Sequence, residues 1–357
     1  SMITIGLLHT RLDPNLVSRA YLYSAIARVE GFRLFYFTSR DVDFEKKKIN
    51  GKAYHGGSWV AREFSFPDVV LNVAGPNTAR QRAIYDRLAA LVPFTSYRLG
   101  RKTTVYNKLI KGKTFLPYII PFRLARKAED VIGFLNQHGK IIIKPNGDSH
   151  GNYIYYIEKD DDGYRFIYRN SAYRVGADEI KEQLASIIAK RSMIMQKYIN
   201  SRRKKGEAYD FRLHVQKNGF GIWQITAIFP RVANDERIIT NLSQGAFLSV
   251  FERFIENEFP DEHKELKFKI EGFALLLARH LDEIYDREFD ELGIDIGLDE
   301  AGKIWIYEVN WRPGHVYIEV KAARAAVNYA AYLARKKKKE RENETPKPKG
   351  NNQGSGN

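Results

Sequence analysis

The first part of the chain combines two spacings of apolar residues. Short apolar runs typical of buried strands occur at residues 3–8, 32–37 and 68–73. Residues 16–29 and 80–91 repeat apolar positions with helical spacing, and Pro93 stops the second of these helices. Strands that alternate with helices predict a largely parallel sheet, so we expect residues 1–95 to form an α/β domain.

The middle of the chain predicts a second, smaller domain at residues 96–200. Its strands are expected at 140–145, 153–158, 164–168 and 193–199, and its helices at 129–138 and 177–191. Gly139 closes the first helix, and Pro145 ends the first strand. A turn-rich loop at 146–152 follows that strand.

The third predicted domain covers residues 201–335. Apolar alternation indicates strands at 209–216, 221–229, 293–298 and 303–310. The turn at Asn218-Gly219 joins the first two strands, and helices are expected at 267–285 and 317–335. Residues 336–357 are polar and almost free of hydrophobic side chains, which predicts a disordered basic tail.

The last predicted hairpin carries acidic and amide side chains on one face. A turn centred on Ala301-Gly302 would place Asp295 opposite Glu308. Asn310 lies two residues beyond Glu308 and therefore shares its face. Such oxygen ligands suit Mg²⁺, which completes its shell with waters and substrate phosphates. These residues alone leave two interpretations open: a metal–nucleotide site, or a polar hairpin face in water.

Composition narrows the class of protein. The chain has 357 residues, of which 44% are hydrophobic and none is cysteine. Disulfides, thiolate metal sites and cysteine nucleophiles are therefore excluded. No apolar run approaches the roughly 20 residues of a membrane span, and no secretory signal is visible. These features favour a cytoplasmic protein without a membrane partner.

The net charge of +15 predicts an acidic partner. Part of the excess lies in two basic runs, at 201–205 and 336–339. Such runs are often only solvated surface, and no nucleic-acid-binding motif accompanies them. A nucleic acid is therefore an unlikely partner, and a small molecule, a peptide or an acidic polymer is the expected substrate.

Several further segments carry groups that suit an anion. Lys144 ends a buried strand, and the glycines of the following loop allow backbone N–H groups to approach phosphate. Asp210 and Arg212 share one face of a strand, and an arginine fork matches oxyanions. An ordinary hairpin loop would explain the pattern at Lys144 equally well, and a surface ion pair would explain the pattern at Asp210 and Arg212. No Ser-His-Asp order and no histidine metal spacing stands out.

The order of these signals is more specific than any one of them. Along the chain they are Lys108, Lys144 with its glycine loop, the strand end at 196–199, Asp210 with Arg212, Asn241, Asp295, and Glu308 with Asn310. This order resembles the ATP-grasp superfamily, in which two domains hold ATP between antiparallel sheets. In detail it resembles the YheC/YheD-like branch, the endospore coat-associated proteins. The likeness covers about residues 3–335, and three runs carry most of it: Phe211-Arg212-Leu213-His214-Val215-Gln216-Lys217-Asn218, Thr240-Asn241-Leu242, and Glu308-Val309-Asn310-Trp311-Arg312-Pro313-Gly314.

The resemblance implies a fold class and roles for the nucleotide site. The fold would be α/β, with α+β character in the ATP-grasp part, and a leading domain would precede a lid domain and a carboxyl-terminal domain. Residues expected to contact the ATP phosphates, directly or through the lid loop, are Lys108, Lys144, Gly147, Ser149 and Gly151. Gln196, Lys197 and Ile199 would surround the adenine, and Asp210 would approach the ribose.

The resemblance also implies the metal and the reaction. Asp295, Glu308 and Asn310 would hold Mg²⁺, usually two ions, with Asn241 nearby. Arg212, and more loosely Arg231, would steady the transferred phosphate. The implied activity is ATP-dependent amide or peptide bond formation between a carboxylate and an amine through an acyl phosphate, in the cytoplasm or at the spore coat.

One departure from the family pattern keeps other functions open. Many relatives carry Gly-Ser-x-Gly-x-Gly in the lid loop, whereas this chain has Asp148-Ser149-His150-Gly151-Asn152-Tyr153. Asp148 would bring negative charge towards phosphates. The alternatives are therefore a non-catalytic nucleotide-binding coat component and, with less support, a basic nucleic-acid-binding protein.

Overall fold

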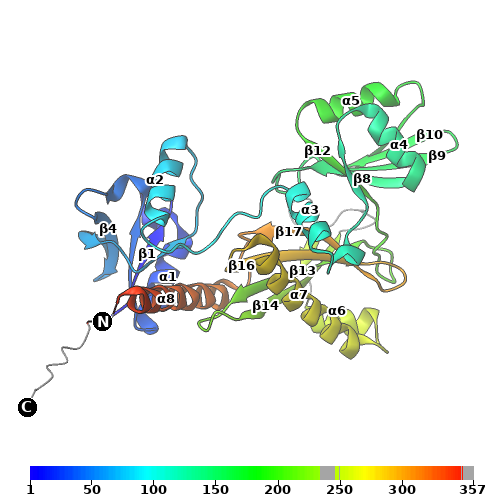
Figure 1. The fold of residues 1–357 in the computed structure, drawn as a ribbon. Coiled ribbons are helices and arrows are strands. Elements are labelled where there is room, and N and C mark those ends of the chain that lie inside the picture. The colour runs from blue at the N-terminus through cyan, green and yellow to red at the C-terminus, as the bar shows by residue number, and fades with distance from the viewer. Residues whose placement is uncertain (234–245, 249, 347, 349–357) are drawn as a thin grey trace, which may run out of the picture. The chain divides into compact units, whose positions relative to one another are not determined.

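The structure is a computed structural model, and it describes residues 1–233, 246–248, 250–346 and 348. The chain divides into two compact units (Figure 1). The first unit comprises residues 1–96, 217–222 and the chain from 315 onward, and the second comprises residues 97–216 and 223–314. Within the described residues, no helix is long and apolar enough to cross a membrane.

The first unit is built around a sheet with the strand order β3-β4-β2-β1-β6, in which β5 pairs with β4. These strands are β1 (Thr4–Leu8), β2 (Arg33–Phe37), β3 (Val42–Asp43), β4 (Lys48–His55), β5 (Ser58–Ser65) and β6 (Val69–Asn72). The predicted strands β2, β1 and β6 pair in parallel, but β2 with β4, β3 with β4, and β4 with β5 are antiparallel, so the prediction of a largely parallel sheet was wrong for half of it. The antiparallel strands β3 to β5 were not predicted, because their side chains are largely exposed and make no apolar run.

Helices cover both faces of this sheet. Alternate strand residues such as Ile5 and Leu7 pack against α1 (Ser18–Val29) and α8 (Glu319–Glu344). The opposite face, with Phe35 and Phe37, packs against α2 (Ala79–Ala89). Period-two alternation of the side chains therefore divides the core into two layers.

The carboxyl-terminal helix α8 differs from its prediction in two respects. It packs on the first sheet through Ala323, Val327 and Ala330, whereas the sequence pattern predicts it in the third domain. It also continues to Glu344, so the predicted disorder was wrong for residues 336–344. Lysine, arginine and glutamate are good helix formers, and a helix that is already nucleated by packing is extended at little cost.

The second unit contains two sheets. The central sheet has the order β11-β10-β9-β8-β12-β7, and its neighbouring strands are antiparallel. Its strands are β7 (Phe122–Ala125), β8 (Lys140–Pro145), β9 (Tyr155–Asp160), β10 (Gly163–Tyr168), β11 (Ser171–Val175) and β12 (Met193–Lys197). Helices α4 (Ala128–His138) and α5 (Ile180–Ala189) pack on one face, against residues such as Ile141 and Ile143 (Figure 1).

The other sheet of this unit has the order β15-β14-β13-β16-β17. Its strands are β13 (Tyr209–Lys217), β14 (Trp223–Ala233), β15 (Ala246–Leu248), β16 (Glu291–Leu298) and β17 (Ile304–Trp311). The helices α3 (Lys102–Gly112), α6 (Phe251–Glu258) and α7 (His263–Tyr285) contribute to its core. With this face buried, the polar side chains on the other face are left to form a site.

Candidate active site

The second unit contains a cavity of about 490 Å³, lined by residues of both its sheets. Most of the predicted site residues line it: Lys144, Ser149, Gly151, Gln196, Lys197, Ile199, Asp210, Arg212, Arg231, Asp295, Glu308 and Asn310. Lys108 and Gly147 are not among the lining residues. Asn241 lies outside the residues that the structure describes.

The hairpin β16–β17 has the predicted register. Asp295 pairs with Glu308, and a register shift between Asp295 and Ile296 marks a bulge beside the pair. Asn310 pairs with Gly293. Among the residues that the structure describes, its side chain donates through Nδ2 to the Gly293 carbonyl at 3.2 Å and to Asp295 Oδ2 at 3.0 Å. Neither bond uses its amide oxygen, which can therefore coordinate a ligand.

Two arginines from the neighbouring strands converge on Asp295. Arg212 lies directly opposite Asp295 in the pairing of β13 with β16. It donates from Nε to Oδ1 and from Nη2 to Oδ2, the latter at 3.1 Å. Arg231 of β14 forms an ion pair with Asp295, with Nη2 3.1 Å from Oδ2, and donates two hydrogen bonds of 2.7 Å to the Asp210 carboxylate. Arg231 therefore links two buried carboxylates.

The ionisation of this cluster is set by burial and pairing together. Burial by itself raises the pKa of Asp295, but Arg212 and Arg231 outweigh it and hold that pKa below the usual 3.8. Burial by itself lowers the pKa of Arg231, and Asp210 and Asp295 reverse this effect, so its pKa lies above the usual value. Asp295 and Arg231 are therefore charged at neutral pH.

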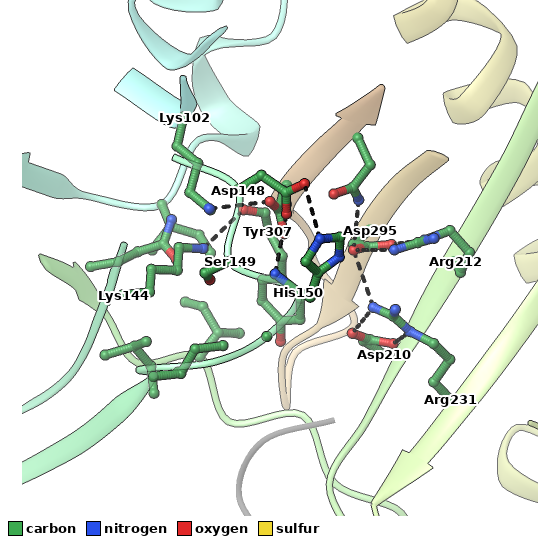
Figure 2. Close-up of a pocket in the computed structure, with 18 of the residues that line it drawn as sticks. Lys102, Lys144, Asp148, Ser149, His150, Asp210, Arg212, Arg231, Asp295 and Tyr307 are labelled. Carbon is green, nitrogen blue, oxygen red and sulfur yellow. Dashed lines mark hydrogen bonds and ion pairs between the residues drawn. The ribbon is translucent and has the colours of Figure 1, made fainter. Parts of the chain in front are cut away.

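Lys102 and Lys144 lie away from the two arginines, on the opposite side of the site from Arg212 and Arg231 (Figure 2). Lys144 Nζ donates to the Tyr307 carbonyl at 3.3 Å. Burial lowers the pKa of Lys144, and the nearby carboxylates of Glu308 and Asp295 partly offset this. Lys102, at the start of α3, forms an ion pair with Glu308 at 3.3 Å. The lysines thus face one side of the carboxylates and the arginines the other.

The predicted lysine at position 108 is placed elsewhere. Its Nζ lies 4.7 Å from the centroid of the Tyr285 ring, on another face of the same helix. Lys102 lines the cavity instead, and sequence reasoning missed it. One sequence feature could have identified Lys102 as a site residue. It lies in the first turn of the helix, immediately after Gly100-Arg101, where the chain enters the domain.

The loop after β8 closes over the lysine side of the cavity. Lys102 Nζ donates to the carbonyls of Pro145 and Gly147, at 2.9 and 3.0 Å, so Gly147 contributes its backbone although it does not line the cavity. His150 and Gly151 adopt positive φ values of 52° and 80°. This conformation suits glycine and is strained for histidine. Asp148 also lines the cavity, as the departure from the family pattern predicts.

The remaining wall of the cavity suits a flat heterocycle. Ile120, Ile142 and Ile154 line it together with Gln196 and Ile199. Gln196 is only 4% exposed, and its Nε2 has no hydrogen-bond partner among the described residues. A buried donor of this kind favours a ligand with an acceptor, because an unmade hydrogen bond is costly.

The donor set fits a hard divalent cation. Glu308 and Asp295 offer carboxylates, and Asn310 offers an amide oxygen, which are the ligands that Mg²⁺ prefers. The side chain of Glu308 is 32% exposed, so it can reach a hydrated ion, whereas Asp295 is almost completely buried. The structure therefore brings together all three predicted metal ligands.

The fold defines the class of protein. An RiPP-associated ATP-grasp ligase from Chryseobacterium gregarium, solved in complex with ADP, and a leader and core peptide, superimposes with a TM-score of 0.53 and 13% identity, covering 94% of this chain and 97% of that one. D-alanine–D-alanine ligase from Bacillus anthracis superimposes with a TM-score of 0.55 and 12% identity, covering 96% and 100%. The chain thus has the fold of ATP-grasp ligases, as predicted.

Sequence comparison identifies the family. Residues 91–333 match the model of the YheC/D like ATP-grasp family, and the chain belongs to this family. Endospore coat-associated protein YheD from Bacillus subtilis (strain 168) is 25% identical over 328 residues, which cover 85% of this chain and 71% of that protein. The resemblance inferred from the ordered motifs is therefore confirmed.

Proposed function

We propose that this protein is an ATP-dependent ligase that joins a carboxylate to an amine. The observation that carries the proposal is the arrangement of charge around the Asp295–Glu308 pair, with two lysines on one side and two arginines on the other. A metal–nucleotide complex requires carboxylates for the ion and cations for the phosphates. The fold of ATP-grasp ligases supports the same assignment.

The nucleotide would extend from the apolar wall to the lysines. Gln196 Nε2 would donate to the adenine, and Lys197 and Ile199 would enclose it. Lys102 and Lys144 would contact the phosphates, with Lys102 in the role that the sequence assigned to Lys108. A cation held by Asp295, Glu308 and Asn310 would neutralise charge on the transferred phosphoryl group when bound.

The reaction would proceed in two balanced steps. An oxygen of the substrate carboxylate attacks the γ-phosphorus, and the bond from that phosphorus to the β–γ bridging oxygen breaks, which yields an acyl phosphate and ADP. The amine nitrogen then attacks the acyl carbon, inorganic phosphate leaves, and the nitrogen loses a proton to solvent. Arg212 and Arg231 would hold the anionic oxygens in place during both steps.

The substrates are proposed by chemical class. The net charge of +15 and the arginine side of the cavity suit a carboxylate-bearing amino acid, peptide or acidic polymer. A similar structure was solved with a leader and core peptide, which makes peptides the first substrates to test. The relative YheD is named an endospore coat-associated protein, and we propose the same association for this ligase.

Calorimetry followed by an ADP-release assay tests the proposal. Titration of ATP into the protein with Mg²⁺ should give saturable binding. ADP release over pools of amino acids and peptides should then reveal the substrates. The absence of nucleotide binding at millimolar ATP would contradict the proposal.

One observation favours a second candidate, a non-catalytic nucleotide-binding protein. Asp148 lines the cavity in the loop where many relatives have glycine, and its charge opposes close phosphate contact. This candidate predicts ATP binding without ADP release under any substrate pool. Replacing Asp148 with glycine should then increase nucleotide affinity without producing turnover.

A further inference from the structure

The carboxylate of Asp295 is fully engaged by hydrogen-bond donors. It accepts two hydrogen bonds from Arg212 and one from Asn310, and it forms an ion pair with Arg231 at 3.1 Å. A carboxylate offers about four acceptor sites, and these three hydrogen bonds and one ion pair surround them. A cation that binds Asp295 must therefore displace at least one of these donors.

The two arginines differ in what holds them. Arg231 makes two bonds of 2.7 Å to Asp210, which keep it in place whether or not it contacts Asp295. Within the described residues, Asp295 is the carboxylate that lies within ion-pair distance of Arg212. Displacement from Asp295 would therefore release the Arg212 fork into the cavity, while Arg231 stays beside it.

We propose that Asp295 is shared between Arg212 and a divalent cation, so that metal binding releases Arg212 to bind the anionic group of the substrate. The inference rests on the proposed function, which assigns a cation to Asp295. Asp210 then positions Arg231 through two hydrogen bonds, and the ribose contact that the family resemblance implies for Asp210 stays a prediction.

Charge balance links the metal to an anion. The four side chains Asp210, Asp295, Arg212 and Arg231 sum to zero charge, and so does the Glu308–Lys102 ion pair beside them. A divalent cation therefore adds two uncompensated positive charges to a largely buried cluster. Buried charge is stable only when it is paired, so an anion should bind more tightly after the metal, and the metal more tightly with the anion. Such reciprocal coupling is typically 5- to 150-fold.

Mn²⁺ binding without turnover tests the exchange. Electron paramagnetic resonance measures free Mn²⁺ in titrations of the wild type, with and without inorganic phosphate, and a protein-free titration corrects for manganese–phosphate pairing. Arg212→Lys keeps the charge but loses the fork, so Mn²⁺ should bind it about ten-fold more tightly without phosphate. Phosphate should tighten Mn²⁺ binding about ten-fold in the wild type and less in the variant. Arg165→Lys, which alters an ion pair with Glu158 outside the cavity, should match the wild type in both conditions.

A second measurement uses the wild type alone and does not depend on a variant that folds. Phenylglyoxal modifies accessible guanidinium groups, and mass spectrometry locates the modified residue. Mn²⁺ should accelerate the modification of Arg212 and leave that of Arg231 unchanged, because Asp210 still holds Arg231.

The outcomes separate this inference from the metal assignment itself. Equal Mn²⁺ affinity in the wild type and Arg212→Lys, with no effect of Mn²⁺ on Arg212 modification, would overturn the exchange while the metal site stands. No Mn²⁺ binding to the wild type, even with ADP present, would remove the metal site and the exchange with it.

Discussion

Replacing Asp295 with asparagine should destabilise the second unit as well as impair the site. Asparagine has the same size and keeps one acceptor oxygen, so the change removes charge without creating a cavity. It leaves Arg212 without a carboxylate partner among the described residues. In either orientation of the amide the NH₂ group faces a donor, because Arg212 Nε lies at Oδ1 and Arg212, Arg231 and Asn310 lie at Oδ2. The loss of stability therefore comes from the unpaired charge of Arg212 and from the contact of the new NH₂ group with another donor.

The magnitude follows from the burial of the partners. Removing one member of a buried ion pair costs about 3–5 kcal/mol. The side chain of Arg212 is 21% exposed and can recover some hydration, and Arg231 keeps Asp210. We therefore expect a loss at the lower end of this range, about 3 kcal/mol in the free energy of unfolding.

Glu308→Gln provides a matched control on the paired strand. It removes the other carboxylate of the proposed metal site, but Glu308 is 32% exposed and its ion-pair partner is Lys102. Partly exposed pairs contribute about 0–1 kcal/mol, so this variant should lose at most about 1 kcal/mol. Both variants should lose ATP turnover, and only Asp295→Asn should lose substantial stability.

Urea titration followed by tryptophan fluorescence measures the difference, because Trp223, Trp305 and Trp311 lie in the second unit. The gap between wild type and Asp295→Asn should depend on pH. Since the folded-state pKa of Asp295 is lowered, its contribution is present above the unfolded pKa, near 3.8, and is lost as pH falls through the folded pKa. Equal midpoints for the two variants at pH 7 would refute the reasoning.

Two further predictions concern other parts of the chain. Lys102→Met should weaken nucleotide binding at least about ten-fold in calorimetry, whereas Lys108→Met should leave it unchanged, because Lys102 lines the cavity and Lys108 does not. The reverse result would restore the assignment of Lys108 to the phosphates. Gly221→Ala should lower the midpoint of thermal unfolding of the first unit. Gly221 has a φ of +72°, and a Cβ at this position would lie 2.4 Å from the Tyr332 ring. An unchanged midpoint would contradict the packing of this turn against α8.

Local patterns were sufficient to predict the hairpin that carries Asp295 and Glu308. A turn signal between two apolar runs determines which residues are opposite each other, and the structure has this register. Most ordered motif residues also line one cavity, because each lies at a strand end or on the polar face of a sheet. These features depend on residues that are close in sequence or on a fold shared by the family.

Features that depend on distant residues could not be predicted. Nothing in the pattern around Asp295 shows that β13 is its other neighbour and places Arg212 opposite it. The packing of α8 on the first sheet likewise depends on a chain return across the whole sequence. Lys108 was chosen by its order among the motifs, whereas the rotation of α3 directs Lys102 into the cavity.

The measurement that tests the central claim most directly is Mg²⁺-dependent ADP release with pooled amino acids and peptides, followed by mass spectrometry of the products. The account predicts ADP formation that requires both a carboxylate and an amine substrate, a product whose mass equals their sum less one water, and loss of both signals in Glu308→Gln. ATP binding without any coupled product, or normal ADP release by Glu308→Gln, would contradict it.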